Sequence, residues 1–175
     1  QGFDPDAPLI PGISAAGWRI GTGLGECGPL LHGAIEVEYQ PGFHLVNALN
    51  ANDGVLVVRN YFPLGSGHTA IFVGADVGEF HFNGRDELFE VAVGKGYRGR
   101  AFGRIGVGSR LEEVRSLFPV FYDSGDEMYY PDSEVAPDAP PGIAFLATET
   151  AEPSGTPILA ISIHDWHVMR RSVVK

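Results

Sequence analysis

This sequence of 175 residues has one cysteine, few basic residues and no long apolar run. The single Cys27 excludes an intramolecular disulfide and any zinc site built on cysteines, and it favours a reducing compartment. No apolar run approaches the roughly 18 residues that a membrane helix needs, so we expect no membrane span. The chain does not begin with a basic and then apolar signal peptide. We therefore predict a cytoplasmic protein, with the periplasm as the alternative if a leader has been removed.

Basic residues are the scarcer charge. Twelve Lys and Arg stand against 22 Asp and Glu, which gives a formal net charge of −10 and an isoelectric point near 4.9. The electric field of this net negative charge repels phosphate backbones and anionic membrane surfaces, and it speeds encounter with a basic protein. We therefore expect no nucleic-acid partner and predict a protein partner that is basic.

Sequence signatures of catalysis are also scarce. The stretch "RIGTGLGECG", residues 19–28, places Gly23, Gly25 and Gly28 in the order G-x-G-x-x-G. A dinucleotide site with this pattern needs a long helix directly afterwards. Here Pro29 follows, and then the strand-like alternation "AIEVEY". We therefore predict no nucleotide site, no other cofactor and a protein that is not an enzyme.

Glycine and proline, in contrast, are abundant. The 24 Gly and 13 Pro separate short β-branched and aromatic runs, which is typical of strands joined by tight turns. Asn83-Gly84 and Ser124-Gly125 each predict a hairpin turn. The runs that predict antiparallel strands are 34–39, 55–62, 69–74, 79–84, 88–97, 120–130, 142–149 and 157–168.

A repeated sequence motif suggests that the chain has two related halves. "RIGTG" begins at Arg19 and "RIGVG" begins at Arg104. After the second copy, Ser109 and Glu112 have the spacing of a capping box, which predicts a short helix ended by Pro119. The first copy is too rich in glycine for a confident helix and predicts a packed turn. We therefore predict an α+β, β-dominated fold in one compact domain, 1–175, with halves at about 11–96 and 97–175, each a short helix packed on antiparallel strands.

Residues 104–147, "RIGVGSRLEEVRSLFPVFYDSGDEMYYPD…PGIAFLA", resemble a unit of small bacterial proteins of unknown function, some of which are suspected toxin-immunity proteins. The unit is similar in plan to the helix-plus-sheet repeats of β-lactamase inhibitor protein and of the small lipoprotein of the outer-membrane barrel assembly machine. The resemblance implies a binding module. It covers about a third of the chain well, and its matched residues are framework positions: Ile105, Gly106, Gly108, Leu111, Val114 and Phe145.

Aromatic side chains beside carboxylates supply the candidate partner site. Tyrosine and tryptophan next to charge are typical of interface hot spots. We therefore predict a non-enzymatic binding protein, most concretely an immunity or inhibitor protein that neutralises a basic toxin or effector domain. The predicted partner-binding residues are Tyr122, Asp123, Asp126, Glu127, Tyr129, Tyr130 and Trp166.

Two other functions stay open. In a strand, the alternation of "HDWH" would put Asp165 and His167 on one face, where they could hold a metal. A third protein ligand is needed, and the other histidines are scattered singly among the strands. The simpler interpretation is a terminal strand with one packed aromatic and solvated polar residues. A metal-dependent hydrolase is therefore one alternative, and an envelope-associated ligand-binding module is the other; the partner and the oligomeric state are not determined.

Overall fold

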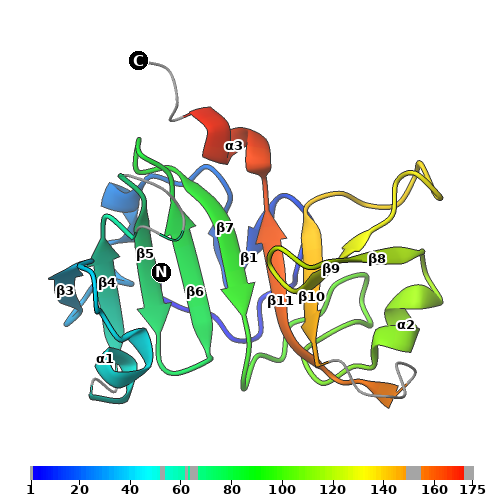
Figure 1. Cartoon of the computed structure of the whole chain (residues 1–175), viewed down its shortest axis with the longest axis horizontal. Helices are drawn as coiled ribbons and strands as arrows, with labels where there is room; N and C mark the ends of the chain where they lie inside the picture. Colours follow the sequence, from blue (N-terminus) through cyan, green and yellow to red (C-terminus); the bar gives the residue numbers. More distant parts are fainter. Residues whose placement is uncertain (1, 52–53, 62, 64–66, 149–154, 172–175) are drawn as a thin grey trace.

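A mixed sheet of nine strands organises the computed structural model (Figure 1). The structure describes residues 2–51, 54–61, 63, 67–148 and 155–171. The strand order is β3-β4-β5-β6-β7-β11-β10-β9-β8. Their bounds are β3 Ile35–Glu38, β4 Val55–Arg59, β5 Thr69–Val73, β6 Gly78–Phe82, β7 Leu88–Val93, β8 Val120–Asp123, β9 Met128–Pro131, β10 Ile143–Ala147 and β11 Ile158–His164. A separate ribbon pairs β1 (Ser14–Ala15) with β2 (Trp18–Arg19).

One strand pair differs from the predicted antiparallel arrangement. β3 and β4 run parallel, while every other pair in the large sheet is antiparallel. The helix α1, Leu45–Ala51, connects β3 and β4 and was not predicted from the sequence. It returns the chain to the end of the sheet from which β3 started, as a parallel pair requires.

The two halves of the chain meet at the centre of the sheet. β4 to β7 and β8 to β11 each follow one another in chain order, and the last strand of one run pairs with the last strand of the other. Val93 lies opposite Ile161, and Val91 lies opposite Ile163. The α+β, β-dominated prediction is confirmed. The relation between the halves stays a prediction.

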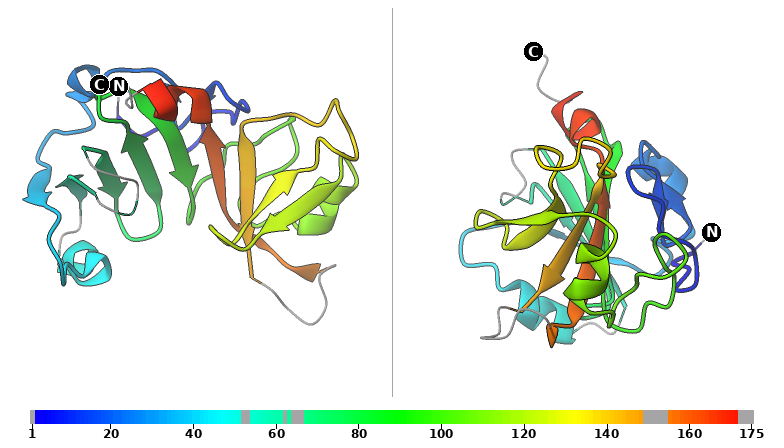
Figure 2. Two further views of the ribbon diagram at one scale, coloured as in Figure 1. Left: turned by 45° about the horizontal axis from the view of Figure 1, so that its top comes forward. Right: turned by 90° about the vertical axis from the view of Figure 1, so that its right-hand side faces the viewer.

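The larger core lies on the side of the sheet that the N-terminal segment covers (Figure 2). Alternate strand residues such as Phe80, Val91 and Phe145 are fully buried there. The short 3₁₀ helix η1 (Leu24–Cys27) and the helix α2 (Leu111–Arg115) pack on the same cluster. Each large apolar side chain buried in this way contributes about 1.5–3 kcal/mol.

The opposite side, which faces the viewer in Figure 1 and is called the front face below, is covered at its two ends. At one end, α1 packs near a small cluster formed by Leu56, Val58, Ala70 and Phe72 of β4 and β5. At the other end, the β8–β9 hairpin curls forward over the sheet (Figure 2). The front face of β6, β7 and β11 lies between these two covers.

The predicted helix cap at Ser109 is wrong. The N-cap of α2 is Arg110, whose backbone N–H donates to Glu113 Oε2 at 2.7 Å. The Ser109 hydroxyl instead accepts from the backbone N–H of Gly106 at 3.0 Å. The backbone of Ser109 and Leu111 is hydrogen-bonded to residues 156–158, at 2.8 and 3.0 Å, which keeps this segment extended until the helix begins.

Both predicted hairpin turns are present. Gly125 donates its backbone N–H to Asp123 Oδ1 at 2.7 Å in the β8–β9 turn. In the β6–β7 turn, the fully buried Asn83 accepts from two backbone N–H groups with its side-chain oxygen. Its amide also donates to the carbonyl of Val168 at 2.8 Å, which attaches the C-terminal helix α3, Trp166–Arg170, to the sheet.

Cys27 is fully buried in η1. Its burial, together with the charge of Glu26, raises the pKa of the thiol to about 11, so the sulfur stays protonated and unreactive. No helix in the described part of the chain is long and apolar enough to span a membrane.

Candidate functional site

Three titratable side chains form a row across the centre of the front face. Glu90 of β7 lies directly opposite His81 of β6 on one side and His164 of β11 on the other. The residues that alternate with them, Phe80 and Ile163, belong to the core. Directly opposed residues have Cβ atoms about 4.5–5.5 Å apart, so the row brings together side chains that are distant in the sequence.

A chain of hydrogen bonds orders this row. The Ser162 hydroxyl donates to Glu90 Oε1 at 2.6 Å and lies 3.0 Å from His164 Nδ1. Because a hydroxyl has one proton, a neutral His164 must carry its own proton on Nδ1 and donate it to Ser162. On the other side of Glu90, His81 Nε2 lies 3.1 Å from Glu79 Oε2.

Burial and neighbouring charges shift the pKa values of His164 and His81 in opposite directions. Burial lowers the pKa of His164 to about 4, although the charges of Asp126 and Asp165 oppose the shift. Burial also opposes protonation of His81, but its hydrogen bond to Glu79 and the charges of Glu90 and Glu79 outweigh that effect and raise the pKa. His164 is therefore a neutral ring at pH 7, whereas His81 holds a proton more readily than an exposed histidine.

Seven aromatic rings, called the aromatic belt below, run across the same face. Five of the distances between successive ring centroids are 5.7 to 6.4 Å, within the usual range of aromatic pairs, and the stacked rings of His164 and Trp166 are closer, at 4.2 Å. A bulge in β7 next to His81 leaves Phe89 without a strand partner and places its ring in this row. The belt consists of Phe121, Tyr130, His164, Trp166, Phe89, His81 and Tyr61 in spatial order.

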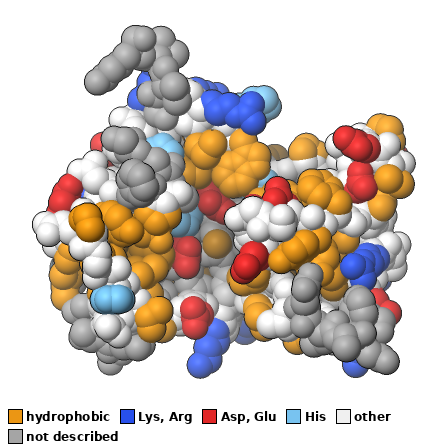
Figure 3. Space-filling model, viewed as in Figure 1, with side chains coloured by type: hydrophobic (Ala, Val, Ile, Leu, Met, Phe, Trp, Pro, Cys, Tyr) orange, Lys and Arg blue, Asp and Glu red, His pale blue; other side chains and the backbone are white. Residues whose placement is uncertain are grey.

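Carboxylates accompany the belt along its length. At the hairpin end, the Tyr130 hydroxyl donates to Asp126 Oδ2. Burial, together with this bond, raises the pKa of Tyr130, so the phenol stays neutral. Glu90 and Glu79 lie near the middle. Figure 3 shows acidic side chains in the hollow at the middle of the face, with hydrophobic side chains on both sides. Phe89, His81 and His164 are buried, so the accessible aromatic surface beside these carboxylates comes from Phe121, Tyr130, Trp166 and Tyr61.

The structure divides the seven predicted partner-binding residues. Tyr130 and Trp166 are members of the aromatic belt. Tyr122 and Tyr129 pair with each other on the opposite side of the hairpin, and Tyr129 is only 9% exposed within the core cluster. The carboxylates Asp123, Asp126 and Glu127 lie at the exposed hairpin tip.

The predicted arrangement of Asp165 and His167 is wrong. β11 ends at His164, and Asp165 is the N-cap of α3. Its Oδ1 accepts the backbone N–H of His167 at 2.8 Å, so this carboxylate is used in capping and the two side chains are not strand neighbours. Among the described residues no group of three His, Cys, Asp or Glu side chains could hold a metal ion.

Sequence reasoning missed Glu90, Ser162 and Phe89. A polar residue inside an otherwise apolar strand, Glu90 in "LFEVAV" and Ser162 in "ILAISIH", was the available signal. Phe89 had no such signal, because the bulge that brings its ring to this face depends on the pairing with β6. The order of the strands, which brings these positions together, was not readable from either segment.

Comparisons with known proteins found no relative of this chain. Neither a family model, nor a curated protein, nor a solved structure matches the chain.

Proposed function

We propose that this protein is a non-enzymatic binding module that captures a basic protein partner on its front face. An immunity or inhibitor protein directed against a basic toxin or effector domain is the most concrete form of this proposal. The observation that carries it is the accessible part of the aromatic belt, Phe121, Tyr130, Trp166 and Tyr61. It lies on a face of the sheet between two covered ends and is accompanied by Asp126, Glu90 and Glu79.

The chemistry of this face suits lysine and arginine. A guanidinium or ammonium group is attracted both to the face of an aromatic ring and to a carboxylate. Aromatic rings that already pack on each other lose little conformational entropy when a partner binds. The formal net charge of −10 would accelerate encounter with a basic partner, and added salt would slow it.

A second function is not proposed. The metal-dependent hydrolase depended on a strand arrangement of Asp165 and His167, which the structure replaces by a helix cap.

The test begins with the product of the neighbouring gene. The two proteins are co-purified, and the dissociation constant is measured by calorimetry at 50 and 300 mM NaCl. We expect a stable complex whose affinity falls as the salt concentration rises. A neighbouring product that does not bind, or that binds with an affinity independent of salt, contradicts the proposal.

Two adjacent residues of β8 provide matched variants. Phe121 is 46% exposed and stacks on Tyr130, whereas Tyr122 is 38% exposed on the other side of the hairpin. We expect Phe121→Ala to weaken binding by more than tenfold, as hot-spot residues do, and Tyr122→Ala to leave it within about twofold. Equal effects of the two variants would refute recognition by the front face. A larger effect of Tyr122→Ala would place the interface on the other side of the hairpin.

A further inference from the structure

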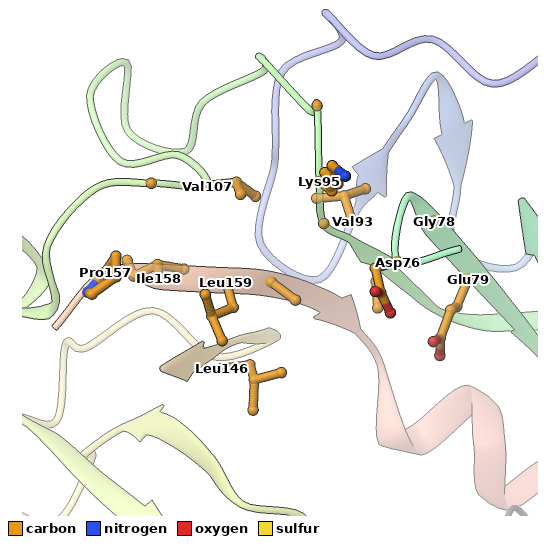
Figure 4. Close-up of a pocket in the computed structure, with 15 residues that line it drawn as sticks. Asp76, Gly78, Glu79, Val93, Lys95, Val107, Leu146, Pro157, Ile158 and Leu159 are labelled. Carbon is orange, nitrogen blue, oxygen red and sulfur yellow. The ribbon is translucent and has the colours of Figure 1, made fainter. Parts of the chain in front are cut away.

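Figure 4 shows the lining of a cavity of about 650 Å³. One lining residue, Glu79, is bonded to His81 of the aromatic belt. The wall of the cavity comes from β6, β7, β10 and β11 together with three loops, those between β5 and β6, between β7 and α2, and between β10 and β11. Ala92 and Ala160 line it on adjacent central strands, and side chains this small leave space that a leucine would fill. Cavities of this volume, with apolar walls and few polar groups, are typical of ligand sites.

The polar and apolar parts of this cavity are separated. Figure 4 shows Asp76 and Glu79 at one end, and Pro157, Ile158 and Leu159 toward the other. Leu159 is 44% exposed, which is high for a leucine on a central strand. An occupant that covers this end would remove apolar surface from water.

The end of the cavity that Asp76 and Glu79 form can still bind a cation. Glu79 holds His81 through Oε2, and its side chain is still 43% exposed. Its Oε1 makes no hydrogen bond to any described residue. Asp76 adds a second carboxylate, while Lys95 supplies one ammonium group from an exposed position. The lining therefore carries two carboxylates against one ammonium group, while His81, the partner of Glu79, is buried outside the lining. The charge that faces the cavity favours a cation over an anion.

We propose that this cavity is the anchoring pocket for one lysine or arginine side chain of the basic partner. The alkyl stem would lie on Leu146 and Leu159, and the charged head would reach Asp76 and Glu79. Long basic side chains bury their methylene groups in this way while their charge pairs with carboxylates. The inference rests on the proposed function, because Glu79 lies beside both the aromatic belt and the cavity.

The first experiment uses three small probes of equal chain length. Hexylammonium, hexanol and hexanoate are titrated into the wild-type protein, and NMR shifts of the cavity residues give the dissociation constants. We expect hexylammonium to bind about two- to fivefold more tightly than hexanol, as expected for a half-exposed ion pair, and hexanoate to bind most weakly. Equal affinities for all three, or tightest binding of hexanoate, overturn the inference.

Variants that keep the side-chain shape identify the charged end. Asp76→Asn and Glu79→Gln should each reduce the preference for hexylammonium over hexanol, whereas Lys95→Gln should increase it. Asparagine tolerates the positive φ of 60° at position 76, so Asp76→Asn is compatible with the fold. Glu134→Gln, an exposed carboxylate in the loop after β9, is the matched control and should change nothing. A preference unaffected by both cavity variants contradicts the assignment.

Competition separates this inference from the proposed function. We expect hexylammonium to weaken the complex with the basic partner, and Asp76→Asn and Glu79→Gln to do the same. A complex that forms but responds to neither overturns the anchoring pocket and leaves the proposed function intact. If hexylammonium binds selectively but no basic protein forms a complex, both the assignment of the cavity to a protein side chain and the proposed function are overturned.

Discussion

Acid should destabilise the folded protein through His164. The ring is 3% exposed, stacked on Trp166 at 4.2 Å and hydrogen-bonded to Ser162, and burial lowers its pKa from 6.5 to about 4. Between these two pH values the unfolded chain binds a proton on this residue that the folded chain does not. The stability that the neutral ring contributes is therefore complete above pH 6.5 and is lost as the pH falls toward 4.

The size of the stability loss in acid follows from the pKa shift of His164. Linkage gives a loss of about 2 kcal/mol between pH 7 and pH 5 and about 3 kcal/mol by pH 4. The window from pH 7 to pH 5 is preferable for the experiment, because ordinary carboxylates begin to titrate below it. His81, whose pKa is raised, contributes with the opposite sign: its stabilisation is present at low pH and is lost as the pH rises through its folded pKa.

A difference measurement isolates His164 from the other groups. Urea unfolding of the wild type and of His164→Asn at pH 7 and pH 5 gives two changes in unfolding free energy. The asparagine amide reaches the position of Nδ1 and keeps a group that can bond to Ser162, but it does not titrate. We expect the wild type to lose about 2 kcal/mol more than the variant. Equal losses would refute the buried neutral histidine, even if the variant is less stable throughout.

Three further predictions concern the fold. Ser109→Ala should lower the free energy of unfolding by about 1 kcal/mol, because the Gly106 N–H loses its acceptor. Glu113→Ala should instead fray the start of α2, because the Arg110 N–H loses its acceptor. Hydrogen exchange at Val114 distinguishes the two variants, and equal fraying in both would show that Ser109 is the cap after all. Asn83→Ala should cost about 3 kcal/mol in chemical unfolding, since two backbone N–H groups and the Val168 carbonyl lose a partner; a cost below 1 kcal/mol would show that water replaces the amide. Gly142→Ala should cost at least about 2 kcal/mol, because φ is +80° and the new Cβ would lie 2.5 Å from the backbone of Gly12; an unchanged melting temperature would contradict this packing.

The strands were predictable because their signal is local. Period-two alternation in "AIEVEY" and continuous apolar runs such as "TAIFVG" need only neighbouring residues to indicate a strand, and Asn83-Gly84 marks a turn in the same local way. The C-terminal helix had a local signal that was not used. Asp165 is a favoured N-cap residue, and basic residues follow in the last turn of α3.

The start of α2 shows where local signals fail. Serine is a strong N-cap by preference, but at position 109 its backbone is bonded to Ile158, a residue far along the chain. A hydrogen bond between distant segments outweighed the capping preference. The same holds for the parallel pair β3–β4, which depends on how α1 packs against β4 and β5.

The sequence by itself determined the β-dominated class, most strand positions and the acidic character, because alternation, turn residues and charge act over a few neighbours or over the whole chain. Only the tertiary structure decided which face carries the candidate site. His81, Glu90 and His164 become neighbours because β6, β7 and β11 pair in one register, and Tyr122 and Tyr130 separate because they point to opposite sides of one hairpin. Strand order and register depend on contacts between distant segments, which no local pattern records.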